Sequence, residues 1–156
     1  MTSNYVIREA SERDTFAMAK VNVDTRRTCY VSFYPMHLLN SMSYEKTEKA
    51  WRSVLWENPD PPGSFAYVAE TTNGQVIGIA IAGPEKSADT AYLGELYVLY
   101  VLPEHHHHGI GRRLVFAVAR RLLSTGISNM LIWVLANNPS RAFYEALGGL
   151  WCGRKL

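Results

Sequence analysis

The sequence predicts an α/β fold, of the α+β mixed-sheet kind, in which a mostly antiparallel sheet of about six or seven strands is flanked by four helices. Helical and β-prone stretches follow one another along the chain, a Pro- and Gly-rich break at residues 58–63 ends a helical first part, and Asn73-Gly74 is a hairpin signal. The 156 residues, 47% of them hydrophobic, suffice for one packed core. We therefore expect a single domain over residues 1–156.

The first part of the chain is expected to hold one strand and two helices. Ser11 followed by Asp14 is typical of a capping box, and Ser43 opens a second capping signal. Pro35 interrupts the aromatic stretch between the two helices, which favours a loop there. The expected elements are a strand over residues 5–8, a helix over 11–29, a loop over 30–36 and a helix over 43–56.

The second part consists of β-prone runs separated by two helical segments. Leu114, Val118 and Leu122 recur at helical spacing, and Asn138-Pro139 is a helix start with Asn as its cap. The expected elements are strands over residues 65–70, 75–82, 91–102, 130–135 and 150–153, and helices over 109–124 and 138–148.

Composition excludes several function classes. The formal net charge of +2 is too small to favour a nucleic-acid partner. No run of about 18 apolar residues is present, so we expect no membrane span, and the N-terminus lacks a signal-peptide pattern. Two cysteines, Cys29 and Cys152, do not make a disulfide scaffold. These features predict a soluble protein of the reducing cytoplasm.

A glycine-containing loop before the helix at residues 109–124 is the strongest chemical signal. Gly109 and Gly111 follow a strand that stops at Pro103, and they let a ligand approach the main chain where helix amides lack partners. Arg112 and Arg113 stand in the first turn, so the pattern is typical of a phosphate cradle. Taken alone, the pattern is often only a tight strand–helix turn, and it is neither a Rossmann nor a Walker fingerprint.

A second pattern gives this loop its context. The run Leu99-Tyr100-Val101 and the spacing Gly109-x-Gly111 are followed by Asn138-x-x-x-Ala142-Phe143-Tyr144 and by Leu147-Gly148. In this order the chain resembles the GNAT superfamily of N-acetyltransferases over essentially its whole length, most strongly at residues 93–149. The resemblance implies the GNAT acyl-CoA N-acyltransferase fold, with acceptor-site helices at about 11–57 and an acetyl-CoA-binding core at about 93–149.

The resemblance also implies a cofactor site, residue by residue. Backbone amides of the loop would hold the pyrophosphate of acetyl-CoA, at His106, His107, His108, Gly109, Ile110, Gly111 and Arg112. The preceding strand would leave its neighbour at a bulge and pair its main chain with the pantetheine arm, at Leu99, Tyr100 and Val101. Asn138 would contact the cofactor, and Tyr144 would lie near its sulfur.

Acetyl transfer to an amine, with coenzyme A as product, needs a base and an acid. An alkyl amine has a pKa of about 10.4, so a base must take its proton at neutral pH. We assign this role to Glu95, which strand alternation places on the side of Tyr97 and Leu99. Tyr144 would protonate the departing thiolate. Two structural alternatives stay open: Glu95 as a solvated or structural strand carboxylate, and Tyr144 as part of a buried helix face.

Residues 105–108 are four consecutive histidines where the family usually has Gln or Arg. Adjacent imidazoles can bind a divalent metal, but no cysteine or carboxylate cluster completes a site here, so we expect no functional metal. We expect the backbone of this loop to matter, with His106 replacing the usual side chain.

These histidines lead to a prediction about pH. Imidazoles gain a proton at about pH 6.5 in general, so protonation would add positive charge beside the cofactor phosphates. We therefore expect acetyl-CoA to bind more tightly below about pH 6.5. The check is KM for acetyl-CoA between about pH 8 and about pH 6, and a flat profile contradicts the prediction.

The C-terminal residues 153–156 leave no room for the seventh strand that relatives usually have. We expect either that a partner chain supplies the missing pairing or that the natural C-terminus continues further. Because an open sheet edge promotes association, the pattern favours a homodimer.

The acceptor is the least determined part of this interpretation. The aromatic residues of the helical part either flank an amine-bearing substrate or form core; they are Tyr30, Phe33, Tyr34, Trp51 and Trp56. A small-molecule amine and a peptide amine both fit. Two other classes compete with the enzyme: a non-catalytic acyl-CoA sensor, and a nucleic-acid-binding domain that uses Arg112, Arg113, Arg120 and Arg121.

Overall fold

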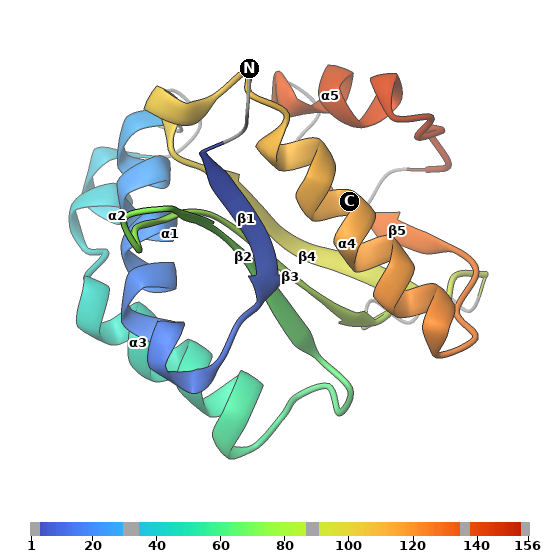
Figure 1. Ribbon diagram of the computed structural model, residues 1–156, viewed down its shortest axis with the longest axis horizontal. Coiled ribbons are helices and arrows are strands. Elements are labelled where there is room, and N and C mark those ends of the chain that lie inside the picture. Colours follow the sequence, from blue (N-terminus) through green and yellow to red (C-terminus); the bar gives the residue numbers. More distant parts are fainter. Residues whose placement is uncertain (1–3, 30–34, 87–90, 135–137, 154–156) are drawn as a thin grey trace.

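A five-stranded sheet forms the centre of the computed structural model, which describes residues 4–29, 35–86, 91–134 and 138–153 (Figure 1). Neighbouring strands follow chain order, antiparallel from β1 to β4, and β5 runs parallel to β4. The strands are β1 (Tyr5–Glu9), β2 (Phe65–Thr71), β3 (Val76–Pro84), β4 (Gly94–Val101) and β5 (Met130–Ile132). The sheet is therefore mixed and mostly antiparallel, as the sequence predicts.

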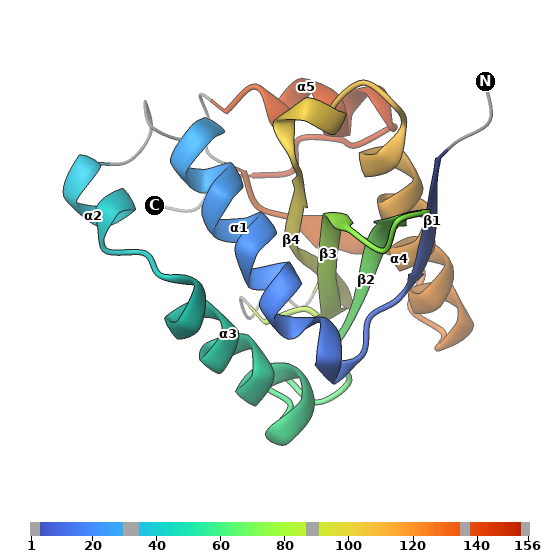
Figure 2. The same ribbon diagram turned by 60° about the vertical axis from the view of Figure 1, so that its left-hand side comes forward.

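Helices cover both faces of this sheet. Figure 2 shows α1 (Thr15–Cys29) and α3 (Tyr44–Arg52) on one side and α4 (Ile110–Ser124) on the other, with α5 (Ser140–Ala146) beyond the end of β4. Short helical segments complete the described chain: η1 (Glu12–Asp14), α2 (Met36–Asn40), η2 (Ser53–Glu57) and η3 (Pro103–His105). No described helix has the length and apolar character needed to cross a membrane.

The core lies between the sheet and these two helical layers. Strand β3 is buried along nearly its whole length, because both of its faces are covered. Its Gly78 lets α4 approach closely, since a Cβ there would lie 3.1 Å from Ile110 and 3.2 Å from Leu114. On the opposite face, Met18 of α1 is fully buried in the same core. The described fold is one packed unit around one sheet.

Both capping signals act as expected. Asp14 accepts from the backbone N–H of Ser11, and Ser43 accepts from the backbone N–H of Lys46 at 3.0 Å. Two other expectations were wrong. Met36, expected to end the loop, begins the helix α2, whose N-cap is Pro35, and residues 150–153 form no strand. Proline favours a helix start as well as a break, and a strand needs a paired neighbour.

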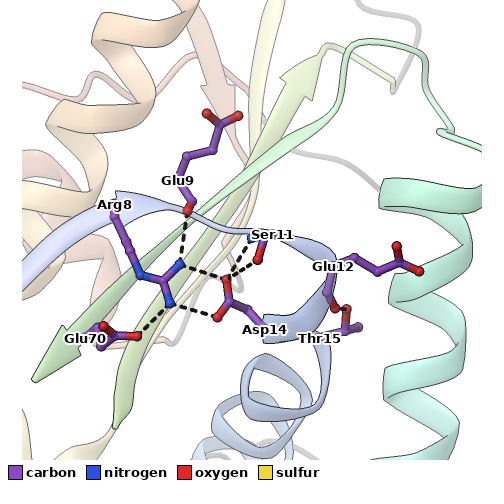
Figure 3. Close-up of polar contacts among 7 residues, drawn as sticks. All are labelled: Arg8, Glu9, Ser11, Glu12, Asp14, Thr15 and Glu70. Atoms are coloured by element: carbon purple, nitrogen blue, oxygen red, sulfur yellow. Dashed lines mark hydrogen bonds and ion pairs between the residues drawn. The ribbon is translucent and has the colours of Figure 1, made fainter. Parts of the chain in front are cut away.

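An ionic network fixes the start of α1 on the sheet (Figure 3). The guanidinium of Arg8 on β1 donates to both carboxylate oxygens of Asp14 at 2.8 Å and to Glu70 on β2 at 2.6 Å. Arg8 therefore ties two strands to the helix that follows. Hydrogen bonds from Arg8 lower the pKa of Asp14 from 3.8 to about 2.

We expect Asp14→Asn to destabilise the fold by about 1–2 kcal/mol at pH 7, because the variant loses this ion pair. The stabilisation is present above the unfolded-state pKa of about 3.8 and disappears as pH falls toward about 2. The variant should therefore approach the wild type in acid. Urea unfolding between pH 2 and pH 7 checks this, with exposed Glu57→Gln as control; a constant difference at all pH values contradicts it.

Candidate functional site

Strand β5 pairs through all three of its residues with the beginning of β4, and β4 continues past the point where β5 ends. Gly94, Glu95 and Leu96 lie opposite Met130, Leu131 and Ile132, and β4 continues to Val101 without a β5 partner. A bulge lies at Tyr97, where Ala82 and Ile81 of β3 pair with Leu96 and Val98. The backbone of β4 beyond Leu96 is therefore open on the β5 side. A ligand with amide groups can add to such an edge as a strand would.

A cavity of about 140 Å³ lies where the two strands separate. It joins residues from β4, the chain after β5, and the start and end of α5. Its lining residues are Leu96, Tyr97, Val98, Leu99, Tyr100, Ile132, Trp133, Val134, Asn138, Ser140 and Tyr144. Four of the residues implied by the resemblance therefore meet here: Leu99, Tyr100, Asn138 and Tyr144. Val101 ends β4 but is not among the lining residues.

The loop before α4 forms a cradle of backbone amides. Among the described residues, no backbone carbonyl accepts from the amides of residues 107–112. Gly109 at the N-cap has φ 78°, and His107 has φ 65°, a left-handed conformation that non-glycine residues rarely adopt. These free donors at a helix N-terminus favour an anion.

Gly111, in the first turn of α4, lets α5 approach the cradle closely. A Cβ at this position would lie 3.2 Å from Cζ of Phe143 on α5. The absence of a side chain therefore lets α5 pack directly on the first turn of α4. Because Tyr144 follows Phe143, this contact also sets where Tyr144 stands relative to the cradle.

The histidine side chains near the cradle bind mainly to backbone. Nε2 of His106 donates to the carbonyl of Val101 at 2.8 Å, and Nδ1 of His108 lies 3.3 Å from the carbonyl oxygen of His105. Residues 106–108 are exposed. In the described ranges, no three His, Cys, Asp or Glu side chains are placed so that together they could hold a metal ion. His106 thus connects the end of β4 to the loop, which supports a structural use of its ring.

Three arginines of α4 contact aromatic rings or a carboxylate. The guanidinium of Arg112 lies 5.2 Å from the ring centroid of Phe116, and that of Arg113 lies 5.1 Å from the ring centroid of Tyr5. Arg121 pairs with Glu9 at 2.8 Å. Three of the four arginines considered for nucleic-acid binding therefore have partners within the fold.

Asn138 and Tyr144 owe their positions to α5. Oδ1 of Asn138 accepts from the backbone N–H of Ser140 at 2.9 Å and from its hydroxyl at 2.7 Å. Asn138 was expected to be the cap of this helix, but the N-cap is Pro139, and Asn138 instead holds Ser140, the first residue of α5. Tyr144 is half-buried and packs edge-to-face against Phe143, with 5.1 Å between the ring centroids. The hydrogen bonds of Asn138 and the ring contact orient α5 and Tyr144, which lines the cavity.

Glu95 is buried, with 5% of its surface exposed, and Oε1 accepts from the backbone N–H of Lys86 at 3.1 Å. Glu95 lies opposite Gly83 of β3, and a Cβ at Gly83 would lie 2.8 Å from the Tyr97 hydroxyl. Since residues directly opposite each other share a face, Glu95 and Tyr97 lie on the same face of the sheet. Glu95 is not among the cavity-lining residues.

The expected side of Leu99 was wrong. Leu99 lies opposite Ala80, an odd number of residues from Gly83, so Leu99 and Glu95 are on opposite faces. The bulge at Tyr97 reverses the alternation that a regular strand would show.

Tyr97 is a lining residue that the sequence analysis did not select for the site. Burial raises its pKa to about 12, so it stays protonated at neutral pH, and its hydroxyl donates to the carbonyl of Pro84. The ammonium of Lys86 lies 4.2 Å from the ring centroid. Trp133 and Ser140 were also missed, because their role depends on where two strands part and no local pattern marks that point.

The structure describes two of the five aromatic residues proposed for the acceptor region. Trp51 and Trp56 are partly buried and pack against the core, which favours the structural alternative for both. Tyr30, Phe33 and Tyr34 lie outside the described residues.

Comparisons with known proteins find similar sequences among N-acetyltransferases. A family model described as FR47-like protein matches residues 86–152. An uncharacterised N-acetyltransferase of Bacillus subtilis, YuaI, is 39% identical over 140 residues, which covers 90% of this chain and 77% of YuaI.

Two solved structures share the fold. The PaiA N-acetyltransferase of Thermoplasma acidophilum, in complex with coenzyme A, has a TM-score of 0.72 at 19% identity. The match covers 96% of this chain and 89% of the PaiA chain. The aminoglycoside N-acetyltransferase AAC(6')-Iy, in complex with CoA, has a TM-score of 0.75 at 18% identity. The match covers 100% of this chain and 94% of that structure's chain. At these identities the likeness concerns the fold.

Proposed function

The chain belongs to the GNAT family of N-acetyltransferases, and from this premise we propose that it transfers the acetyl group of acetyl-CoA directly to a primary amine while both substrates are bound. The observation that carries this proposal is the cavity beside β4, beyond the end of its pairing with β5. Residues of α5 form one wall of this cavity, and the amide cradle before α4 lies next to α5. The acceptor is a small-molecule or peptide amine.

The residues fit acetyl-CoA at both of its ends. The free amides of residues 107–112 suit the pyrophosphate, and the unpaired edge of β4 at Leu99 and Tyr100 suits the amide-bearing pantetheine arm. A Cβ at Gly111 would crowd Phe143, which favours a glycine at this point of the cradle. Asn138 supports the same site by fixing the start of α5.

The proposed chemistry assigns one role to each of two side chains. Glu95 takes the proton from the acceptor ammonium, directly or through water, so that the amine becomes nucleophilic. Amides near the bulge polarise the acetyl carbonyl. The amine nitrogen forms a bond to the carbonyl carbon, the carbon–sulfur bond breaks, and Tyr144 gives its hydroxyl proton to the leaving thiolate. The proton that the nitrogen loses as it becomes an amide then restores the Tyr144 hydroxyl.

Calorimetric titration with acetyl-CoA, followed by a screen of primary amines for thiol release, tests this proposal. We expect micromolar binding that weakens for an analogue without the pyrophosphate, and then amine-dependent release of coenzyme A. Binding without any amine-dependent release would favour the sensor alternative. Absence of binding by the folded protein would contradict both.

A mechanism with both substrates bound has a kinetic signature. Double-reciprocal plots at several amine concentrations should intersect, whereas a covalent acetyl-enzyme gives parallel lines. This measurement separates direct attack from the covalent alternative for whichever amine the screen identifies.

A further inference from the structure

One lysine of the chain stands beside the cavity. The Nζ atom of Lys86 lies 4.2 Å from the centroid of the Tyr97 ring, and Tyr97 lines the cavity. The face of an aromatic ring attracts an ammonium group at this distance. The other lysines of the described ranges, Lys20, Lys46 and Lys49, belong to α1 and α3. Lys86 therefore brings a primary amine, the group that the proposed reaction acetylates, to a residue of the cavity wall.

The backbone around Lys86 is fixed against β4. The N–H of Glu85 donates to the carbonyl of Leu93 at 3.0 Å, and the N–H of Lys86 donates to Oε1 of Glu95 at 3.1 Å. These two hydrogen bonds keep the chain after β3 beside the start of β4. The position of the Lys86 side chain over Tyr97 is thus set by backbone contacts on both sides.

The amine of Lys86 also lies close to the residue to which we assign the base. Glu95 and Tyr97 share one face of the sheet, and the carboxylate of Glu95 is bonded to the backbone of Lys86 itself. Lys86 is exposed, so its side chain can move without loss of core packing. A base and a mobile amine are therefore held together at the start of β4.

The bulge of β4 lies at Tyr97, the residue that the Lys86 amine contacts. In the proposed function, amides near this bulge polarise the acetyl carbonyl. The Lys86 amine ends a long and flexible side chain, which lets it move from the ring to a carbonyl beside it. An amine tethered so close to the reacting carbon has a far higher effective concentration than an amine free in solution.

We propose that Lys86 accepts the acetyl group within its own chain, so that the protein modifies itself at this residue. This inference rests on the proposed function. The Lys86 ammonium gives a proton to Glu95, directly or through water, and its nitrogen then forms a bond to the acetyl carbon. The carbon–sulfur bond breaks, Tyr144 protonates the leaving thiolate, and the second proton lost by the nitrogen restores the Tyr144 hydroxyl. The products are acetyllysine and coenzyme A, and the positive charge over the Tyr97 ring is lost.

Acetyl-CoA with a deuterated acetyl group tests this proposal, because the label distinguishes new acetylation from any acquired during expression. The purified protein is incubated with it without added amine, and mass spectrometry of peptides locates the label. We expect Lys86 to be labelled at least about tenfold faster than exposed Lys49, which reports the uncatalysed reaction. Release of coenzyme A should stop once Lys86 is consumed. The labelling rate constant should not change with protein concentration, because the acceptor belongs to the same chain.

Variants separate catalysed from uncatalysed labelling. Lys86→Arg keeps a cation for the Tyr97 ring but offers no primary amine, so release of coenzyme A without added amine should disappear. Lys49→Arg is the matched control and should release coenzyme A as the wild type does. Glu95→Gln and Tyr144→Phe should slow the labelling of Lys86 and leave that of Lys49 unchanged, since only Lys86 uses the site.

Three results would overturn the inference and leave the proposed function in place. They are equal labelling of Lys86 and Lys49, labelling of Lys86 that both Glu95→Gln and Tyr144→Phe leave unchanged, and amine-dependent release of coenzyme A with no label on Lys86. A labelling rate constant that rises with protein concentration would also overturn it, because the amine would then come from another copy. Failure of the wild type to bind acetyl-CoA is a different result, which overturns the proposed function and the inference with it.

Discussion

Tyr144→Phe should reduce kcat by about 100-fold or more and leave affinity for acetyl-CoA nearly unchanged. The substitution removes only the hydroxyl, which in our proposal protonates the departing thiolate. The phenyl ring keeps its edge-to-face contact with Phe143 and its place on α5. Calorimetric titration with acetyl-CoA and steady-state release of coenzyme A measure the two quantities separately.

Tyr67→Phe is the matched control, because it makes the same chemical change on β2, away from the cavity. Thermal unfolding of both variants shows whether either hydroxyl matters for stability. If Tyr144→Phe keeps wild-type turnover, Tyr144 is not the acid. If its turnover and melting temperature fall together, the hydroxyl has a structural role.

The parts of the fold that local chemistry decides could be predicted well from sequence. Ser11 and Ser43 cap helices because their hydroxyls and neighbours satisfy amides within three residues. Asn138 accepts from the N–H of Ser140 at the start of α5, although the N-cap itself is Pro139. Gly109 takes a positive φ where the chain turns from η3 into α4. In each case the information lies within one turn of the chain.

The features that depend on strand pairing were harder to predict. Strand β5 ends at Ile132, short of the expected residue 135, and this early end opens the cavity. The bulge at Tyr97 reverses which face Leu99 occupies. Both depend on the register between strands that are distant in sequence.

Glu95→Gln should lower kcat/KM by about 100-fold at neutral pH, and the deficit should shrink as pH rises. The acceptor ammonium, with a pKa of about 10.4 for a simple alkyl amine, loses its proton to solvent at high pH and then needs no base. Glutamine retains an oxygen that can accept from the N–H of Lys86, so the fold of β4 should persist. The measurement is a pH profile of kcat/KM for both proteins.

The shape of that profile distinguishes a base from a structural carboxylate. A structural role predicts a deficit that is the same at every pH and accompanied by a lower melting temperature. Exposed Glu104→Gln, near the cradle but on η3, should keep the wild-type profile and serves as control. Recovery of Glu95→Gln at high pH, with Glu104→Gln unchanged throughout, would mean that the buried carboxylate of β4 removes the proton. Because Glu95 does not itself line the cavity, such a result would also favour transfer of that proton through a water molecule.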